Sequence, residues 1–432
     1  MSSETTSCDG CRVFVGLDDT RLVSIEATGH GLVMTIETTA TIVGCPTCGV
    51  IARSKGRDRV ELVDLPNFGR PTRTIWLKRR FTCPDPDCPM ASFTERDDRI
   101  APPRQSMMTR AARWATHQVG KHARSVSGVA EDLGCEWHTA NAAVIAYGEA
   151  LLESDDERIG PAESLGLDEV AFAKLGPRRH LEFATSIVDT GTAQLLDLVP
   201  GRTGEQAKRW IERRPEEWRD AVKWATLDLS GTYRSVFTAT VPKATMVADP
   251  FHVVRHANSK VDECRRRVQN ETLGHRGRKS DPLYRTRRLL TLAEERLSEN
   301  GRDKLMGLLR AGDPRGEVQA TWNAKEAVRE LYAHADEQTA TAWIDQLIVD
   351  MADETWPVEV RSLGRTLKAW RNEIVAWHRS RASNGPTEAA NNLTKRVKRA
   401  AFGFRSFRNF RVRSLLYAGK PNWSLLATVT PR

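Results

Sequence analysis

The order of secondary-structure patterns after residue 163 constrains the possible folds of this chain more than any other feature. Three β-rich runs come first, at residues 164–172, 180–188 and 193–199, and the segment DTGT between the last two predicts a hairpin turn. A helical pattern follows at 204–214, with Ala207, Trp210 and Ile211 on one face, and strand-like runs cover 221–228 and 245–254. This region is therefore expected to form an α/β domain.

A three-stranded meander followed by helix, strand, helix and strand is the ribonuclease-H-like order. In that arrangement the first and fourth strands are neighbours. Asp168 lies in the middle of the first strand and Asp228 ends the fourth, so the two carboxylates are expected side by side. A single strand-end Asp usually caps a loop. Two carboxylates on adjacent strands repel each other unless a cation lies between them, so the pair is the informative feature.

A third acidic residue, Glu388, comes much later in the chain. The segment SNGPTE predicts a helix start, with Pro386 in the first turn. The helix that follows would carry Glu388, Asn392, Lys395 and Arg399 on one face. This face could complete a metal site and hold a DNA backbone; the alternative is an exposed helix with scattered charge.

Oxygen ligands of this kind suit Mg²⁺, or Mn²⁺ in its place, because these ions keep open positions for water and phosphate oxygens. Two such ions about 4 Å apart can activate an attacking water or hydroxyl and stabilise a leaving oxygen. Asp168, Asp228 and Glu388 are therefore candidate catalytic residues and magnesium ligands.

Four cysteines near the N-terminus have the spacing of a zinc site. Cys45 and Cys48 form one knuckle, Cys83 and Cys88 form a second, and β-rich runs at 60–63 and 72–81 with a turn at 69–71 separate them. Two turn-borne pairs joined by a hairpin supply the tetrahedral geometry that Zn²⁺ requires. The alternatives are a coincidence of spacing or a redox dithiol.

The other four cysteines do not fit this pattern. Cys8 and Cys11 form a further pair without two partners nearby and are expected to bind no metal. Cys135 and Cys264 are expected to be core thiols.

Residues 125–149 fit a helix-turn-helix. Gly134 would permit the tight turn, and Ala130 would let the second helix pack closely. The recognition helix would then begin with the candidate DNA-binding residues Trp137, His138, Thr139 and Asn141. The alternative is two packed helices without a role in DNA recognition.

Residues 254–383 are almost wholly helical in pattern and rich in Arg, Glu and Leu. We interpret them as an all-α insertion that splits the α/β domain before its last acidic residue. The tryptophans of this segment are expected to lie mostly in its core.

The chain has 432 residues, more than one compact core of ordinary size holds, so two to four domains are expected. Its balance of 40% hydrophobic and 28% charged residues is typical of soluble globular proteins. It has no apolar run long enough to span a membrane. Residues 1–11 are polar and acidic, without the positively charged lead and apolar core of a signal sequence, so none is expected. We therefore expect a cytoplasmic protein without a membrane partner.

The formal net charge of +9 is unevenly distributed, because basic residues cluster at 265–288 and 395–413. Clustered Lys and Arg suit a polyanion, since each neutralised phosphate releases counterions. The alternative is a solvated face, and charge alone does not separate the two.

Several blocks of the chain, in order, resemble the ISL-three family of insertion-sequence transposases. These blocks are CPTCG, RRFTCPDPDCPMASFTER, LGLDEVAF, LDLSGTYR, VADPFHVV and SNGPTEAANNLTKRVKRAAFGFRSF. The resemblance extends over nearly the whole chain. It implies a DDE transposase, whose N-terminal ribbon and helix-turn-helix bind the terminal inverted repeats of the element and whose later half cuts and joins DNA. It also implies a bacterial, nucleoid-associated protein.

The resemblance also assigns residues. It puts the first acid on Asp168 and the glutamate on Glu388, and it puts the second acid on Asp228, with Asp249 as the runner-up. Lys395 matches a basic position common among DDE enzymes, and His252 is expected to be a helper or structural residue. Family members often carry a His after the first knuckle; this chain has none there, which favours a four-cysteine zinc site.

The expected architecture is a multidomain α+β protein. Its predicted parts are a zinc ribbon at 1–100, a helix-turn-helix domain at 101–160, the first part of a ribonuclease-H-like α/β catalytic domain at 161–258, the all-α insertion at 259–380, and the C-terminal part of the catalytic domain at 381–432. The expected partners are the double-stranded DNA of the repeats and of the target, bound by a homodimer or higher oligomer because two ends must be brought together. The alternative functions are a catalytically silent DNA-binding regulator derived from a transposase and a structure-specific nuclease on the same fold.

Overall fold

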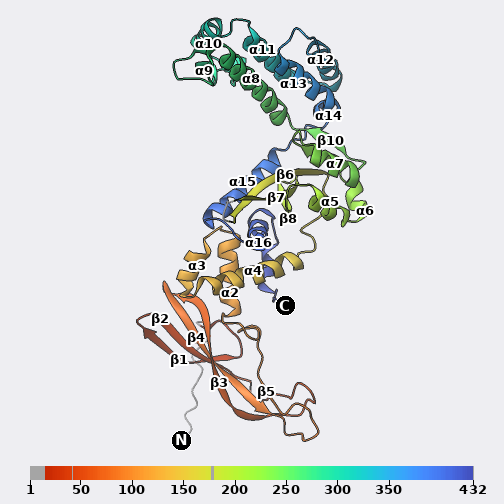
Figure 1. Ribbon diagram of the computed structural model, residues 1–432. Coiled ribbons are helices and arrows are strands. Elements are labelled where there is room, and N and C mark those ends of the chain that lie inside the picture. Colours follow the sequence, from red (N-terminus) through yellow and green to blue (C-terminus); the bar gives the residue numbers. More distant parts are fainter. Residues whose placement is uncertain (1–14, 41, 177–179, 432) are drawn as a thin grey trace. The chain divides into compact units, whose positions relative to one another are not determined.

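The computed structural model describes residues 15–40, 42–176 and 180–431, so Cys8 and Cys11 lie outside the described residues. The chain forms two compact units (Figure 1). The first comprises Met1–Arg158, Phe172–Arg179 and Leu393–Arg432. The second comprises Ile159–Ala171 and His180–Asn392. No helix of the described residues is both long and apolar enough to cross a membrane.

The first unit contains a five-stranded sheet. Its strands are β1 (Thr20–Thr28), β2 (Gly31–Thr38), β3 (Arg53–Asn67), β4 (Arg70–Thr82) and β5 (Ser92–Thr94). Their order is β1-β2-β4-β3, and β5 pairs with β4. Strands β3 and β4 confirm the two predicted runs between the cysteine pairs, whereas β1 and β2 were not predicted.

The turn between β3 and β4 lies one residue earlier than predicted. Asn67 pairs with Arg70, so Phe68 and Gly69 form a two-residue turn and Arg70 already belongs to β4. Both turn residues have positive φ, 53° and 71°. This is the backbone that a type I′ hairpin turn requires, and Gly69 supplies half of it without steric cost.

Helices pack beside this sheet around one core. They are α2 (Thr109–Gly120), α3 (Val126–Leu133), α4 (Trp137–Ser154) and α16 (Phe407–Ala418), followed by the short helix η3 (Trp423–Ala427). The core joins Trp76 of β4 to Leu133, Leu151 and Leu416, each at most 1% exposed. These helices confirm the predicted helical pairing at 125–149.

A buried ion pair ties the sheet to α2. Asp64 of β3 is fully buried, and the guanidinium of Arg110 donates to its carboxylate with an Nε–Oδ1 distance of 2.7 Å. Thr74 of β4 donates to the same carboxylate at 2.5 Å. Removing one partner of such a group leaves a desolvated charge, so the pair fixes how the helix lies on the sheet.

The second unit is built on another five-stranded sheet. Its strands are β6 (Ser164–Leu175), β7 (His180–Asp189), β8 (Gln194–Pro200), β9 (Trp224–Leu227) and β10 (Thr245–Ala248), in the order β10-β9-β6-β7-β8. The helices α5 (Glu205–Glu212), α6 (Glu216–Asp220) and α7 (Gly231–Thr240) lie between β8 and β10 in sequence. Strand β9 pairs in parallel with both β6 and β10. The strands predicted at 164–172, 180–188, 193–199 and 221–228 are confirmed, although β9 begins only at Trp224. The predicted helix with its buried Ala207, Trp210 and Ile211 is also confirmed.

The predicted strand at 245–254 is wrong beyond Ala248. Strand β10 ends there, Asp249 is the N-cap residue, and α8 (Pro250–Leu273) begins at Pro250. Proline fits the first turn of a helix because its missing N–H has no partner to lose there. The apolar residues after it therefore continue as a helix.

The segment from α8 onward is helical, as the pattern at 254–383 predicts. It continues with α9 (Pro282–Thr286), η1 (Glu294–Arg296), α10 (Glu299–Gly312), α11 (Glu317–Glu330), η2 (Leu331–Ala333), α12 (Glu337–Asp350), α13 (Val358–Ala369) and α14 (Arg371–Ser380). In Figure 1, α8 leads away from the sheet and α14 returns beside β10. Trp322 and Trp370 are buried as predicted, whereas Trp356 is 38% exposed. The chain then forms α15 (Gly385–Ala400).

We predict that Arg110→Met destabilises the first unit by about 3–5 kcal/mol, because it leaves the carboxylate of Asp64 buried without its cation. Urea unfolding measures this. Arg124→Met is the matched control, since the Arg124–Asp132 pair is half-exposed and its loss should cost less than about 1 kcal/mol. Equal losses in the two variants would contradict the prediction.

Candidate active site

The register of three parallel strands brings acidic residues to one edge of the second sheet. Gly166 of β6 pairs with Thr226 of β9, so the same register two residues on sets Asp168 opposite Asp228. Ala248 of β10 pairs with Leu227, which sets Asp249 next to Asp228. Residues in equal register on parallel strands point to the same face. The sheet thus brings Asp168 and Asp228 together, as the strand order predicts.

Asp228 is a buried carboxylate with one oxygen that lacks a partner. Its Oδ1 is buried and has no hydrogen-bond partner within the described part of the chain. Burial raises the pKa of Asp228; His252 and Arg255 oppose that rise, and the charge of Asp168 adds to it. A buried carboxylate oxygen beside a second carboxylate is stabilised by a cation. This pair of residues therefore fits a divalent ion.

Asp168 is held by two N–H donors. The side-chain amide of Asn391 donates to its Oδ2 at 2.8 Å, and the backbone N–H of Glu169 donates to its Oδ1 at 2.7 Å. Each carboxylate oxygen can accept more than one bond, so both donors can orient the group and leave room for a cation. Asn391 was not predicted from the sequence. Its signal would have been a polar residue on the buried face of α15, where it is 1% exposed.

The first turn of α15 packs directly on the sheet. Thr387 is fully buried, and its Oγ1 lies only 2.1 Å from where a Cβ on Gly166 would be. Asn384, just before the helix, lies 3.5 Å from the hydroxyl of Thr226 through its Oδ1. Its backbone N–H donates to Asp249 Oδ1 at 3.0 Å. Only glycine at 166 permits this approach, and the helix carrying Glu388 depends on it.

Glu388 lies on an exposed part of this turn. It follows the buried Thr387 directly and precedes Asn391 by one turn. The structure brings the helix of Glu388 to Asp168 through Asn391. It does not bring the three carboxylates together, because only the cysteine group described below has three or more ligand atoms within 4.8 Å of one another among the described residues.

Asp249 differs from Asp228 in its environment. It is 5% exposed, its carboxylate already accepts the N–H of Asn384, and its backbone begins α8. His252, in the first turn of α8, lies near the carboxylate of Asp228 and opposes the rise of its pKa more than any other group does. The carboxylate of Asp249 thus has a structural partner, whereas Oδ1 of Asp228 has none among the described residues.

The four predicted zinc ligands lie together in the first unit. Their sulfur atoms are all within 4.8 Å of one another. The Cys45–Cys88 and Cys48–Cys83 sulfur distances are 3.8 and 3.5 Å. Four thiolates about 2.3 Å from a tetrahedral ion are about 3.8 Å apart, so the group has the size of a zinc site.

Backbone donors favour the thiolate form at the first knuckle. The N–H of Cys48, helped by that of Thr47, lowers the pKa of Cys45 to about 7. The turn itself is closed by the N–H of Gly49, which donates to the carbonyl of Cys45 at 2.9 Å.

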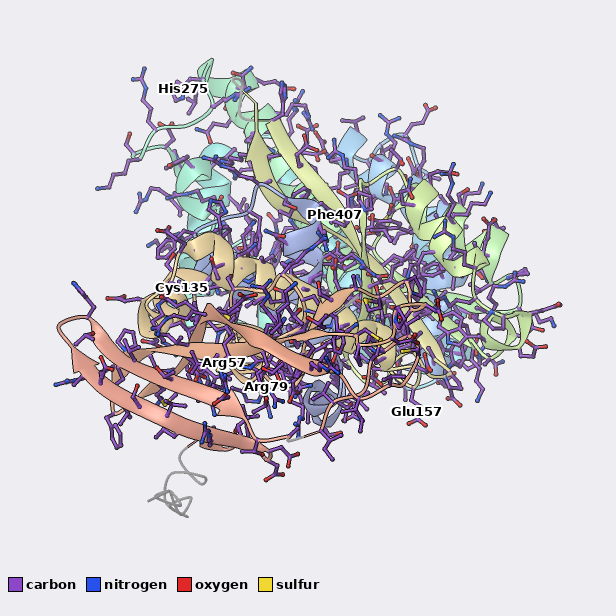
Figure 2. The ribbon with its side chains drawn as sticks, turned by 90° about the horizontal axis from the view of Figure 1, so that it is seen from below. Arg57, Arg79, Cys135, Glu157, His275 and Phe407 are labelled. Atoms are coloured by element: carbon purple, nitrogen blue, oxygen red, sulfur yellow. The ribbon has the colours of Figure 1, made fainter. Side chains whose placement is uncertain are left out.

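On the same sheet, Arg57 of β3 and Arg79 of β4, labelled in Figure 2, form ion pairs with Glu37 and Glu95. The predicted core thiols differ: Cys264 is fully buried, whereas Cys135 is half-buried.

The helix pair α3–α4 has a tight turn at Gly134, which adopts φ 62° and ψ 37°. Pro71 of β4 packs against it, 2.6 Å from where a Cβ would be, and Arg73 donates to its carbonyl at 2.5 Å. Trp137, the first residue of α4, is 40% exposed, His138 beside it is exposed, and Thr139 and Asn141 are half-buried. Asn392, Lys395 and Arg399 are exposed on α15.

Comparison with known proteins gives these features a context. A family model for DDE transposases of the ISL3 type, with the description "Transposase", matches residues 165–414, more than half of the chain. The chain belongs to the ISL3 (ISL-three) family of transposases. The family match begins in β6, before Asp168, and ends in α16, so it contains all the candidate catalytic acids and the insertion.

Curated relatives agree with this family. The transposase for insertion sequence element IS1001 of Bordetella parapertussis is 26% identical over 397 residues, 88% of this chain and 90% of the relative. Transposases for insertion sequence element IS1557 from two Mycobacterium tuberculosis strains are 27% identical over 328 residues, 68% of this chain and 71% of each relative. The similarity to the first relative therefore extends well beyond the family match.

We predict that Gly166→Ala lowers the unfolding free energy of this transposase by about 1–3 kcal/mol, because the new methyl group would overlap Thr387 and Asn384. Urea unfolding measures the loss. Gly307→Ala in α10 is the control: a Cβ there meets nothing within 4 Å, and alanine favours the helix. If both variants were as stable as the parent, the packing of α15 on β6 would be looser than described.

Proposed function

We propose that this chain is an active insertion-sequence transposase that binds the terminal inverted repeats of its element and cleaves and joins DNA at Asp168, Asp228 and Glu388. Membership of a transposase family supports a nucleotidyl-transfer reaction on DNA. The observation that carries the catalytic assignment is the buried, unpartnered oxygen of Asp228 beside Asp168. The five-strand order around these residues supports a ribonuclease-H-like catalytic domain at 161–258 and 381–432, interrupted by the insertion at 259–380.

In the proposed reaction, a water oxygen attacks the phosphorus at the element end, and the bond to the 3′ oxygen breaks. That 3′ oxygen takes up a proton. In the second step the 3′ hydroxyl loses its proton to solvent as it attacks a target phosphorus, and the displaced 3′ oxygen of the target strand takes up a proton. Bound Mg²⁺ or Mn²⁺ would supply Lewis acidity for both steps. Asp168, oriented by Asn391, and Asp228 would hold the ions from the sheet. Glu388 would complete the ligand set from α15, beside the exposed cations Lys395 and Arg399.

Asp228 is the preferred second acid and Asp249 the runner-up. Asp228 has an oxygen without a partner, whereas the carboxylate of Asp249 accepts the N–H of Asn384. A buried acceptor that is already satisfied gains less from a cation than one that is not.

DNA recognition is proposed for the first unit. The tight turn at Gly134 and the exposed Trp137 and His138 support a helix-turn-helix at 101–160, with Thr139 and Asn141 as further contacts. Asn392, Lys395 and Arg399 would contact the DNA backbone from α15. A dimer or higher oligomer would hold the two element ends.

We predict that Asp168→Asn abolishes strand cleavage, a loss on the order of 10³-fold or more, while binding of end-sequence DNA stays nearly unchanged. The measurement is cleavage and strand transfer with end-sequence DNA and Mg²⁺. Glu169→Gln is the matched control, because the adjacent side chain points to the other side of the strand.

The same assay separates the alternatives. Cleavage without joining would identify a structure-specific nuclease, and binding without cleavage by the parent chain would identify a silent regulator. Loss of DNA binding in Asp168→Asn would count against the catalytic assignment.

We also propose that the cysteine group binds Zn²⁺ and stabilises a zinc ribbon within residues 1–100. The tetrahedral sulfur spacing supports this. Purified protein should contain about one zinc ion per chain, and Cys48→Ser should lose the metal and unfold at a lower temperature. Metal analysis and thermal unfolding measure both effects. Cys135→Ser, outside the group, is the control and should retain the zinc; a similar loss there would refute the assignment.

A further inference from the structure

The basic segment 265–288 separates into two parts with different roles. In α8, Arg265 pairs with Asp262 at 2.6 Å, and Arg267 pairs with Glu359 at 2.9 Å and with Glu271 and Glu317. These guanidiniums are committed to carboxylates inside the second unit. They are not available to a polyanion, so the sequence cluster does not form one continuous basic surface.

The second part runs from the α8–α9 loop through α9 to Arg288, and most of its cations are exposed. Five of them are exposed, and none forms an ion pair with a described residue: Arg276, Arg278, Lys279, Arg285 and Arg288. The only acidic residue between 274 and 288 is Asp281. Figure 2 labels His275 on this loop, at the margin of the drawn structure with long side chains around it pointing outward.

Asp281 is used to order the loop. Its carboxylate accepts the backbone N–H of Arg278 and the side-chain amide of Gln269 at 3.0 Å, and His275 Nδ1 lies 3.5 Å away. Gln269 is fully buried in α8 and accepts from Arg265 at 3.3 Å. Arg265 thus stabilises the loop through Gln269 and Asp281, while the cations of the loop itself stay exposed.

Gly277 fixes the loop against the helix. Its φ is 124°, and a Cβ there would be 2.6 Å from Gln269 and 2.7 Å from Tyr284. Such a close approach, together with the bonds to Asp281, gives the loop a defined shape. A preformed cationic loop loses less conformational entropy on binding than a flexible one.

We propose that the α8–α9 loop is a second, sequence-independent contact for duplex DNA, in which Arg276, Arg278 and Lys279 bind phosphates. Arginine and lysine match phosphate oxygens in charge and hydrogen bonding, and the family acts on DNA. The loop belongs to the second unit, so it is distinct from the helix-turn-helix proposed in the first. The inference rests on a DNA substrate but on none of the proposed catalytic or helix-turn-helix residues.

The test measures binding of the full chain to a random-sequence duplex by fluorescence anisotropy over a range of salt. In the triple variant Arg276→Gln, Arg278→Gln, Lys279→Gln, affinity should fall at least about tenfold at low salt. The slope of log K against log salt should become shallower by about 2 to 3, roughly one per lost phosphate contact.

The matched control removes three other exposed cations of the same insertion, by Lys304→Gln, Arg365→Gln and Lys368→Gln. This control variant has the same net charge as the test variant, so the two differ only in where the cations are removed. If the contact is local to the loop, the control should keep the parent affinity within about twofold and the parent salt slope. Equal losses in the two triple variants would reduce the effect to net charge and overturn the proposal. So would a loss limited to terminal-repeat DNA. Thermal unfolding verifies that both variants keep the parent fold.

Asp281→Ala separates the ordered loop from its charge. The variant is more positive by one charge, so charge alone predicts tighter binding, whereas loss of the ordered loop predicts weaker binding. Weaker binding supports the proposal, and tighter binding overturns it.

Two further variants make failure of the proposed function distinguishable. Trp137→Ala with His138→Ala should lose the preference for terminal repeats but keep the salt slope on random DNA. Asp168→Asn should lose cleavage alone. A parent chain that never cleaves would refute the proposed function and leave the loop result standing.

Discussion

The docking of the first turn of α15 on β6 is the contact on which the candidate active site depends. It joins residues 223 positions apart through the bond from Asn391 to Asp168. It requires Gly166, because Thr387 fills the space where a side chain would lie. Between β6 and α15 the chain forms the other strands of the sheet and the whole helical insertion. The contact of Thr387 with Gly166 therefore has to hold α15 in place whatever the length or sequence of the insertion.

The second constraint on the candidate site is the repulsion between the neighbouring carboxylates of Asp168 and Asp228. Parallel pairing of β6 and β9 sets Asp168 opposite Asp228, and burial of Asp228 raises the free energy of its ionised form. A fold selected for stability alone would place an apolar residue or a cation there. The cost is explained if a divalent ion occupies the site during the reaction, which agrees with membership of a transposase family.

Charge is distributed differently in the insertion. Arg267 of α8 pairs with Glu317 of α11 and Glu359 of α13 and holds these helices together, whereas Arg265 pairs with Asp262 of α8 itself. The arginines of the α8–α9 loop form no ion pair with a described residue. Arginine therefore has a structural role in α8 and remains accessible to a ligand in the loop that follows. Burial and the nearest carboxylate decide which role applies.

The sequence by itself determined most strands and helices of the second unit, because their periodicities and the turn at residues 189–192 are local, but it did not predict β1 and β2 of the first unit. It also determined the cysteine spacing and the neighbouring positions of Asp168 and Asp228, which follow from strand order. It misplaced the end of β10, although Pro250 marks a helix start, and it did not single out Asn391. Only the tertiary structure decided that Asn391 meets Asp168, that Gly166 admits α15, and which arginines stay exposed. Those outcomes depend on packing between segments distant in sequence, and no local pattern encodes such contacts.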